Sequence, residues 1–251
     1  MAESRFAADP DLRHLQHTPT GAAYVSQITA QESDRQARAA FRELALRIAP
    51  PGARLFDFGA GPGIDARFFA ERGFTIDAYD VDPRMAEFFT SHCRNLIQGG
   101  RVNLTGGSYR QFLAREAPYA GDCAHLVVAN FAPLNLVDDL RELFVKFNAL
   151  TTARGQVLAS VLNPCYLPEM RTRWWWRGAA RLWRDGELFL PGPQAPHYRR
   201  LLRHLRATSA PHFRLARVFP GLPSSSDGRS GWLQVAKARY MFLLFDKTPC
   251  S

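Results

Sequence analysis

One stretch of the sequence, residues 55–83, constrains the fold of this chain more than any other. It reads LFDFGAGPGIDARFFAERGFTIDAYDVDP. A short apolar run is followed by a turn with three glycines, then by apolar residues at helical spacing, and then by a second apolar run. Gly73 stands where a helix commonly ends in a left-handed conformation. The stretch therefore predicts a strand, a tight turn, a helix and a second strand parallel to the first.

Two acidic residues flank the glycine turn and narrow the range of ligands. Asp57 lies just before the turn, and Asp80 ends the second strand. Because the carboxyl ends of parallel strands meet at one sheet edge, we expect both acids and the turn to lie together. A dinucleotide-binding turn normally has a third glycine where this chain has Ile64, and Asp57 would repel a pyrophosphate. The pattern favours a ligand with a ribose diol and a positive charge over a nicotinamide cofactor.

This arrangement resembles the class I S-adenosylmethionine-dependent methyltransferases. In that family an acid and three alternating glycines precede an acid at the end of the second strand, and the matching residues here are Asp57, Gly59, Gly61, Gly63 and Asp80. The resemblance covers residues 37–163 well and the last strands in outline. It implies that the cofactor is S-adenosyl-L-methionine and that the product is S-adenosyl-L-homocysteine.

The resemblance also implies a set of cofactor-binding residues. They are Asp57, Gly59, Ala60, Gly61, Asp80, Val81, Ser108 and Asn130. Asp57 and the glycines would hold the methionine end, Asp80 the ribose diol, and Val81 the adenine. Ser108 stands where the family often has an acid that contacts the adenine amino group. Asn130 either faces the methyl-transfer region or caps the end of the fourth strand.

The remaining pattern alternates between strands and helices. Helices are expected over residues 37–48, 85–96 and 140–150, and strands over 101–105, 125–129 and 155–162. Two further strands, 213–219 and 237–245, follow without a helix between them and suggest an antiparallel pair. We therefore expect an α/β fold with a doubly wound, mostly parallel sheet and helices on both faces. Its C-terminal pair is similar to that of the family's seven-stranded, Rossmann-like sheet.

Composition agrees with one methyltransferase domain over residues 1–251. The chain is 46% hydrophobic, which is ample for a core. We divide it into an N-terminal helical cap over residues 1–36, the central unit, and an insertion over residues 165–212. The four scattered cysteines favour reduced thiols over disulfides or a metal site. No secretory signal and no apolar run of about 20 residues is visible, so we expect a cytoplasmic location.

Most of the net charge of +9 lies in an arginine-rich segment, residues 165–217, which holds eleven arginines but three acidic residues. Within it, RTRWWWRGAARLWR predicts an amphipathic helix. Arg173, Arg177, Arg181 and Arg184 would share one face, and Trp175, Trp176, Ala179, Leu182 and Trp183 the other.

Three interpretations of this helix are open. It can cover the sheet with its tryptophans, and it can lie on an anionic membrane surface. It can also form an acceptor-binding lid, with Trp175 and Trp176 lining the pocket and Tyr24 closing the other side. Nucleic acid is disfavoured because no recognition motif accompanies the charge.

The function predicted from the sequence is methyl transfer to a small-molecule acceptor. The acceptor atom would be nitrogen or oxygen, and the metabolite acidic or aromatic. A general base is needed only if the acceptor is protonated at working pH, with His92, His125 and His197 as candidates. The alternatives are a methyltransferase acting on RNA or phospholipid and a non-catalytic module that binds S-adenosylmethionine. No catalytic residue and no oligomeric state is predicted.

Overall fold

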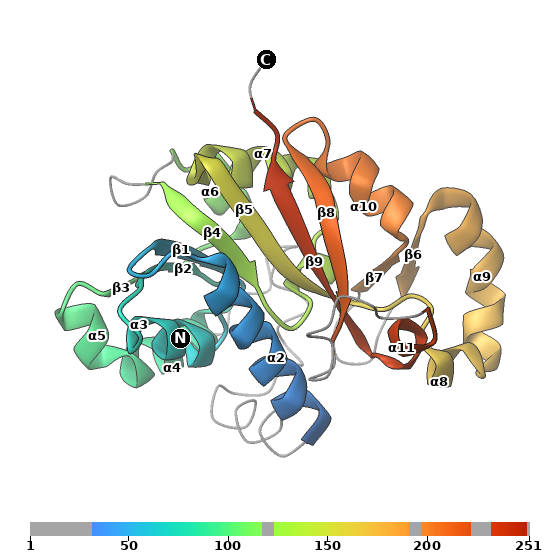
Figure 1. Cartoon of the computed structure of the whole chain (residues 1–251), viewed down its shortest axis with the longest axis horizontal. Helices are drawn as coiled ribbons and strands as arrows, with labels where there is room; N and C mark the ends of the chain where they lie inside the picture. The colour runs from blue at the N-terminus through green and yellow to red at the C-terminus, as the bar shows by residue number, and fades with distance from the viewer. Residues whose placement is uncertain (1–31, 117–122, 191–196, 222–231, 250–251) are drawn as a thin grey trace, which may run out of the picture.

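A seven-stranded sheet forms the centre of the molecule in the computed structural model, which describes residues 32–116, 123–190, 197–221 and 232–249 (Figure 1). In spatial order its strands are β3 (Val102–Thr105), β2 (Thr75–Tyr79), β1 (Arg54–Phe58), β4 (Ala124–Ala129), β5 (Thr151–Leu162), β9 (Tyr240–Lys247) and β8 (Phe213–Pro220). The first five are parallel, and β9 runs antiparallel to both β5 and β8. The predicted fold class, including the C-terminal antiparallel pair, is confirmed.

Helices cover both faces of the sheet. One face carries α2 (Glu32–Ile48), α3 (Ile64–Ala70), α4 (Pro83–His92) and α5 (Arg94–Gln98). The other carries α6 (Tyr109–Ala114), α7 (Leu140–Leu150) and α10 (Leu202–Ser209). Each face has its own hydrophobic core, as expected when a parallel sheet is buried on both sides.

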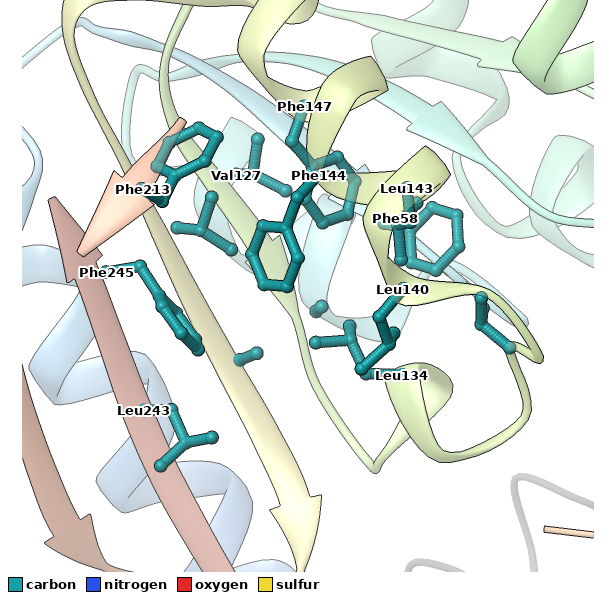
Figure 2. Close-up of a cluster of buried hydrophobic side chains, with 14 of the residues drawn as sticks. Phe58, Val127, Leu134, Leu140, Leu143, Phe144, Phe147, Phe213, Leu243 and Phe245 are labelled. Atoms are coloured by element: carbon teal, nitrogen blue, oxygen red, sulfur yellow. The ribbon is translucent and has the colours of Figure 1, made fainter. Parts of the chain in front are cut away.

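Aromatic side chains lock α7 onto the sheet. Figure 2 shows Phe144 and Phe147 pointing from α7 toward the strands, with Phe245 beneath Phe144. The ring of Phe144 lies 5.1 Å from that of Phe245, and the ring of Phe147 lies 5.3 Å from that of Phe58. Truncating one such phenylalanine typically costs about 3–5 kcal/mol. This packing fixes the strands whose carboxyl ends carry the site.

Two predicted elements have different boundaries in the structure. A short helix, α11 (Trp232–Lys237), lies between β8 and β9, so the expectation of a strand from residue 237 and of no intervening helix is wrong. The Asn163 side chain explains the change, because its amide donates to the carbonyls of Val235 and Ala238 at the end of α11. The helix expected over residues 85–96 is two helices, α4 and α5, which meet at Cys93.

Part of the arginine-rich segment forms a small accessory unit, whose two-stranded sheet was not predicted from the sequence. It consists of α8 (Leu167–Met170), α9 (Arg173–Asp185) and a two-stranded antiparallel sheet, β6 (Glu187–Leu190) with β7 (His197–Arg200). In Figure 1 this unit projects beyond β8, at the opposite end of the molecule from α3 and α5. α10 packs instead on α7 and β8, as part of the main body.

α9 packs on β6 rather than on the central sheet. Gly178 makes this contact, since a Cβ there would lie 2.3 Å from Leu188. Trp175 and Leu182 are buried, but Trp176 is 65% and Trp183 58% exposed. The interpretation of α9 as a helix that covers the sheet with its tryptophans is therefore wrong for Trp176 and Trp183. The hairpin is too narrow to cover more than the central stripe of the helix.

Two side chains fasten the hairpin to the loop after β4, which contains the short helix η3 (Pro133–Asn135). The buried Arg200 guanidinium donates to the carbonyls of Leu134, Val137 and Asp138 at 2.7–2.9 Å. Asn135 donates to the Tyr198 carbonyl and accepts from the Leu162 amide. The accessory unit is thus bonded directly to the carboxyl edge of the sheet.

Candidate functional site

The glycine turn lies at the carboxyl edge of the sheet, as predicted. Gly59, Gly61 and Gly63 have φ angles of +70°, +54° and +80°, a region that side chains disfavour. A Cβ on Gly59 would lie 2.6 Å from Pro133, and one on Gly63 would lie 2.7 Å from Phe89. The turn is therefore held between the loop after β4 and helix α4, with no room for side chains at these two positions.

Asp57, at the end of β1, is a buried carboxylate with an unsatisfied oxygen. It is 3% exposed, and its Oδ2 accepts no hydrogen bond from the residues that the structure describes. Burial raises the pKa of Asp57 well above its usual value, and the nearby charges of Asp65 and Asp80 raise it further against the opposing effect of Arg38 and Arg42. A desolvated carboxylate in this state fits a cationic ligand group.

Asp80, at the end of the neighbouring strand β2, reaches across to the glycine turn. Its two oxygens accept from the backbone amides of Gly61 at 2.6 Å and Asp82 at 2.9 Å. The amides of Gly59 and Ala60 donate to the carbonyl of Tyr79. Burial raises the pKa of Asp80 to about 6, although the hydrogen bonds from the Asp82 and Gly61 amides lower it in part. Asp57, the turn and Asp80 are therefore brought together as expected.

A buried ion cluster that sequence reasoning missed lies behind the turn. Asp65, in the first turn of α3, pairs with Arg38 at 2.5 Å and with Arg42 at 2.6 Å, both from α2. Burial alone would raise the pKa of Asp65, but the two guanidinium groups and the Asn130 amide lower it below its usual value. Arg38 and Arg42 are four residues apart, so they share a face of α2. That spacing was the only trace of the cluster in the sequence.

Asn130 belongs to the same cluster. Its amide nitrogen donates to Asp65 at 2.9 Å, and its oxygen accepts from the Phe131 amide at 2.9 Å. These contacts fit the interpretation of Asn130 as a strand-end cap. Phe131 and Ala132 then adopt φ angles of 60° and 65°, which cost on the order of 1–3 kcal/mol each for residues with side chains. The strained loop is held by the Ala132 amide, which donates to Ser160 Oγ at 3.2 Å.

An aromatic and cationic cluster extends from this loop. The guanidinium of Arg38 lies 4.3 Å from the centre of the Phe131 ring, and the Tyr240 ring meets Phe131 edge to face at 5.6 Å. Burial raises the pKa of Tyr240, although the positive charges of Arg239, Arg199 and Arg38 lower it in part. Tyr240 was also missed by sequence reasoning, because it begins β9, far along the chain from the turn.

The other predicted site residues have varied surroundings. Val81 packs against the core beside α6 and α7, and Ser108 caps α6 by accepting from the Gln111 amide at 3.3 Å. The Trp175 indole donates to the Pro164 carbonyl at 2.8 Å, which anchors α9 to the end of β5. Trp176 is exposed, on a helix far from the glycine turn (Figure 1). Tyr24 and most of the predicted N-terminal cap lie outside the described residues.

The three candidate bases are scattered over the fold. His92 stacks on Phe88 at the end of α4, His125 is exposed near the start of β4, and His197 begins β7. In the described ranges, no cluster of histidine, cysteine and acidic side chains is suited to hold a metal ion. No helix within those same ranges is long and apolar enough to span a membrane.

This fold and this pair of buried acids define a class I S-adenosylmethionine-dependent methyltransferase. A family model described as a methyltransferase domain matches residues 30–190, and the chain belongs to that family. S-adenosylmethionine is therefore its cofactor. The buried acids fit it, since the cofactor has a ribose diol and a positively charged methionine end. No curated protein sequence matches the chain significantly.

Solved structures of low sequence identity share the fold. An S-adenosylmethionine-dependent methyltransferase from Mesorhizobium loti is 15% identical with a TM-score of 0.61, over 84% of this chain and 99% of that one. The 1,6-didemethyltoxoflavin-N1-methyltransferase of Burkholderia thailandensis is 16% identical with a TM-score of 0.60, over 91% and 87%. The geranyl diphosphate C-methyltransferase of Streptomyces coelicolor A3(2) is 17% identical with a TM-score of 0.56, over 84% and 76%.

Proposed function

We propose that the protein transfers a methyl group from S-adenosylmethionine to the nitrogen or oxygen of a small, acidic or aromatic metabolite. The observation that carries the donor half is the pair of desolvated carboxylates, Asp57 and Asp80, on either side of a glycine turn. The observation that carries the acceptor half is the ring pair Phe131 and Tyr240 beside Arg38.

In this proposal the donor is held from both ends. Asp57, with the backbone of Gly59, Ala60 and Gly61, binds the methionine end, where the unsatisfied oxygen of Asp57 accepts a hydrogen bond from the ammonium group. Asp80 accepts from the ribose hydroxyls, since a carboxylate has more lone pairs than the two backbone amides occupy. Val81 and Ser108 border the adenine.

The acceptor half rests on the loop after β4. Phe131 and Tyr240 offer two rings for a planar acceptor. Arg38 and Arg42 share the single carboxylate of Asp65, and the positive charge left over beside the rings suits an acidic acceptor. The structure from Burkholderia thailandensis holds 1,6-didemethyltoxoflavin together with S-adenosylhomocysteine. That neighbour agrees with a small-molecule acceptor for this fold.

Methyl transfer requires little from the side chains beyond orienting the donor and the acceptor. When bound, the cofactor supplies a methyl group on a sulfonium, whose departure needs no proton. Holding the acceptor atom in line can lower the barrier by about 7–11 kcal/mol relative to an encounter in solution. The roles left to this chain are to fix the two molecules and to exclude water. Asp65 and its two arginines serve the first role by fixing the turn against α2.

The donor site is tested by calorimetric titration with S-adenosylhomocysteine. Asp57→Asn and Asp80→Asn should each weaken binding by roughly 10-fold to 150-fold, the range for losing hydrogen bonds to a charged group. Asp77→Asn is the matched control, because Asp77 is a buried acid of β2 that pairs with Arg54 at 2.7 Å, away from the turn. It should lower stability and leave the affinity unchanged. Tight binding of NAD without binding of S-adenosylhomocysteine would contradict the proposal.

The acceptor class is tested with S-adenosylmethionine that carries a labelled methyl group. The protein is incubated with a cell extract, which is then separated into small metabolites, RNA and lipids. We expect label in the metabolite fraction, and we expect Phe131→Ala to reduce it while binding of S-adenosylhomocysteine is retained. Label confined to RNA or lipid would refute the small-molecule assignment, and label in no fraction would favour the non-catalytic alternative.

A further inference from the structure

We infer that the outer face of α9 is a docking surface for an anionic lipid bilayer, which holds the enzyme at a membrane without spanning it. This surface, which we call the α9 face, comprises Arg173, Trp174, Trp176, Arg177, Arg181, Trp183 and Arg184. All seven side chains are exposed. The inference does not depend on the identity of the methyl acceptor.

The positive charge of the α9 face is largely uncompensated. Asp185 is the one acid that pairs with it among the described residues, at 2.8 Å from Arg184 and 3.7 Å from Arg181. Arg173 and Arg177 have no ion-pair partner there. Surface arginines commonly have acidic neighbours, so a row without them attracts an anionic surface instead.

These arginines do not serve the stability of the helix. The first turn of α9 contains no acidic residue and begins with Arg173, where the positive end of the helix dipole disfavours a cation. Arg173, Arg177 and Arg181 also follow at intervals of four residues, which places like charges side by side. The sequence keeps a charge pattern that weakens the isolated helix, and an external anionic partner accounts for it.

The exposed tryptophans border this row of arginines on both sides. Trp174 is 39% exposed on one flank, and Trp176 and Trp183, seven residues apart, are on the other. Tryptophan is enriched at membrane interfaces, where its ring lies among the headgroups, and arginine binds lipid phosphates at the same depth. The two residue types on one helix are the composition of an interfacial helix.

A bilayer fits this surface better than a nucleic acid does. Proteins that bind single strands use a positively charged groove lined with aromatic residues. The α9 face is instead the convex side of the helix, opposite the stripe that packs on β6, and α9 lies at the outer edge of the molecule (Figure 1). A helix flanked by three indoles is also broad for a base-reading helix in a major groove. A convex ridge with cations in the middle and tryptophans beside them suits a deformable, flat anionic surface.

The test is sedimentation of the full chain with vesicles. We expect binding to vesicles of equal parts phosphatidylglycerol and phosphatidylcholine, little binding to phosphatidylcholine alone, and weakening by salt. Tryptophan emission should shift to shorter wavelength on binding. Arg173→Gln with Arg177→Gln should weaken binding by roughly 30-fold, since each cation near the surface contributes about 5-fold.

The matched control is Arg94→Gln with Arg154→Gln, which removes the same charge from exposed positions outside α9. It should change vesicle binding far less. Binding of S-adenosylhomocysteine by every variant verifies that the proteins are folded. A further variant, Trp176→Ala with Trp183→Ala, separates the tryptophans from the charge and should lose most of the emission shift.

Three results with vesicles would overturn the inference. They are absence of binding to the anionic vesicles, equal binding to neutral vesicles, and equal loss in the control variant. A fluorescent single-stranded oligouridine is titrated in parallel. If it binds more tightly than the vesicles and its binding is lost in Arg173→Gln with Arg177→Gln, the α9 face is a nucleic-acid surface and the lipid assignment is wrong.

Discussion

The glycine turn and the α9 face both present charged groups that are only partly compensated, and they do so in opposite ways. At the turn the charge is negative and buried, with Asp57 3% and Asp80 8% exposed. On α9 the charge is positive and exposed to solvent. A buried carboxylate without a partner is costly and selects one small cationic ligand by fixed geometry. Exposed arginines cost little and attract any extended anionic surface. The degree of burial thus decides whether a charged group selects one small ligand or attracts an extended surface.

The largest expected effect concerns the support of the turn. Asp65→Ala should destabilise the protein by about 3–5 kcal/mol, because it leaves the partly buried Arg38 and Arg42 without a counter-charge. Urea denaturation measures the change. The control is Glu71→Ala, which removes an exposed pair with Arg67 and should leave the midpoint unchanged. Equal midpoints for the two variants would mean that the buried cluster is not what holds α2 on the turn.

The next prediction compares two adjacent tryptophans of α9. Trp175→Ala should cost about 3–5 kcal/mol, since it opens a cavity under the helix and removes the hydrogen bond to Pro164. Trp176→Ala should change the stability by no more than about 0.5 kcal/mol. Thermal unfolding of both variants decides the matter. A large loss of stability in Trp176→Ala would show that its ring contributes to packing. The α9 face could then not be contrasted with the glycine turn as an exposed surface.

The smallest expected effect is a dependence of cofactor affinity on pH. The pKa of Asp80 in the ligand-free protein is about 6, above the ordinary value, so the carboxylate takes up a proton as the pH falls through 6. The ionised carboxylate is the stronger acceptor for the ribose hydroxyls. The affinity for S-adenosylhomocysteine should therefore fall by roughly tenfold between pH 7 and about pH 5. Asp80→Asn should flatten this dependence, and a profile unchanged by that substitution would assign the titration elsewhere.

The same pKa has the opposite consequence for stability. Because the folded form of Asp80 binds its proton more tightly than the unfolded form does, this residue makes the ligand-free protein less stable as the pH rises from about 4 to about 6. The contribution of Asp80 therefore makes the ligand-free protein more stable at low pH, and it makes cofactor binding tighter at high pH.

The sequence predicted the features that depend on neighbours along the chain. The strand, turn, helix and strand around Asp57 and Asp80 fall within residues 55–83, and a β-α-β unit brings its own ends together. The seven-stranded sheet also followed from regular alternation. By contrast, the pair between Arg38 and Asp65 and the contact between Phe131 and Tyr240 join segments that only the packed sheet brings together.

The accessory unit was less predictable for a different reason. The helical pattern of α9 was clear from the sequence. A helical wheel does not predict, however, how much of the helix surface the neighbouring element covers. The narrow β6–β7 hairpin covers Trp175 and Leu182 and leaves Trp176 and Trp183 in water. In the same way, the short α11 depends on carbonyls held by Asn163, a contact across more than seventy residues.

The bonds from Arg200 and Asn135 make the hairpin and the loop after β4 one mechanical body. Arg200 holds three carbonyls between Leu134 and Asp138, and Asn135 links Tyr198 to Leu162. A tilt of α9 against a bilayer would therefore pull on the same short segment that sets Phe131 in its strained conformation. The conformation of Phe131 is therefore coupled mechanically to the position of the accessory unit.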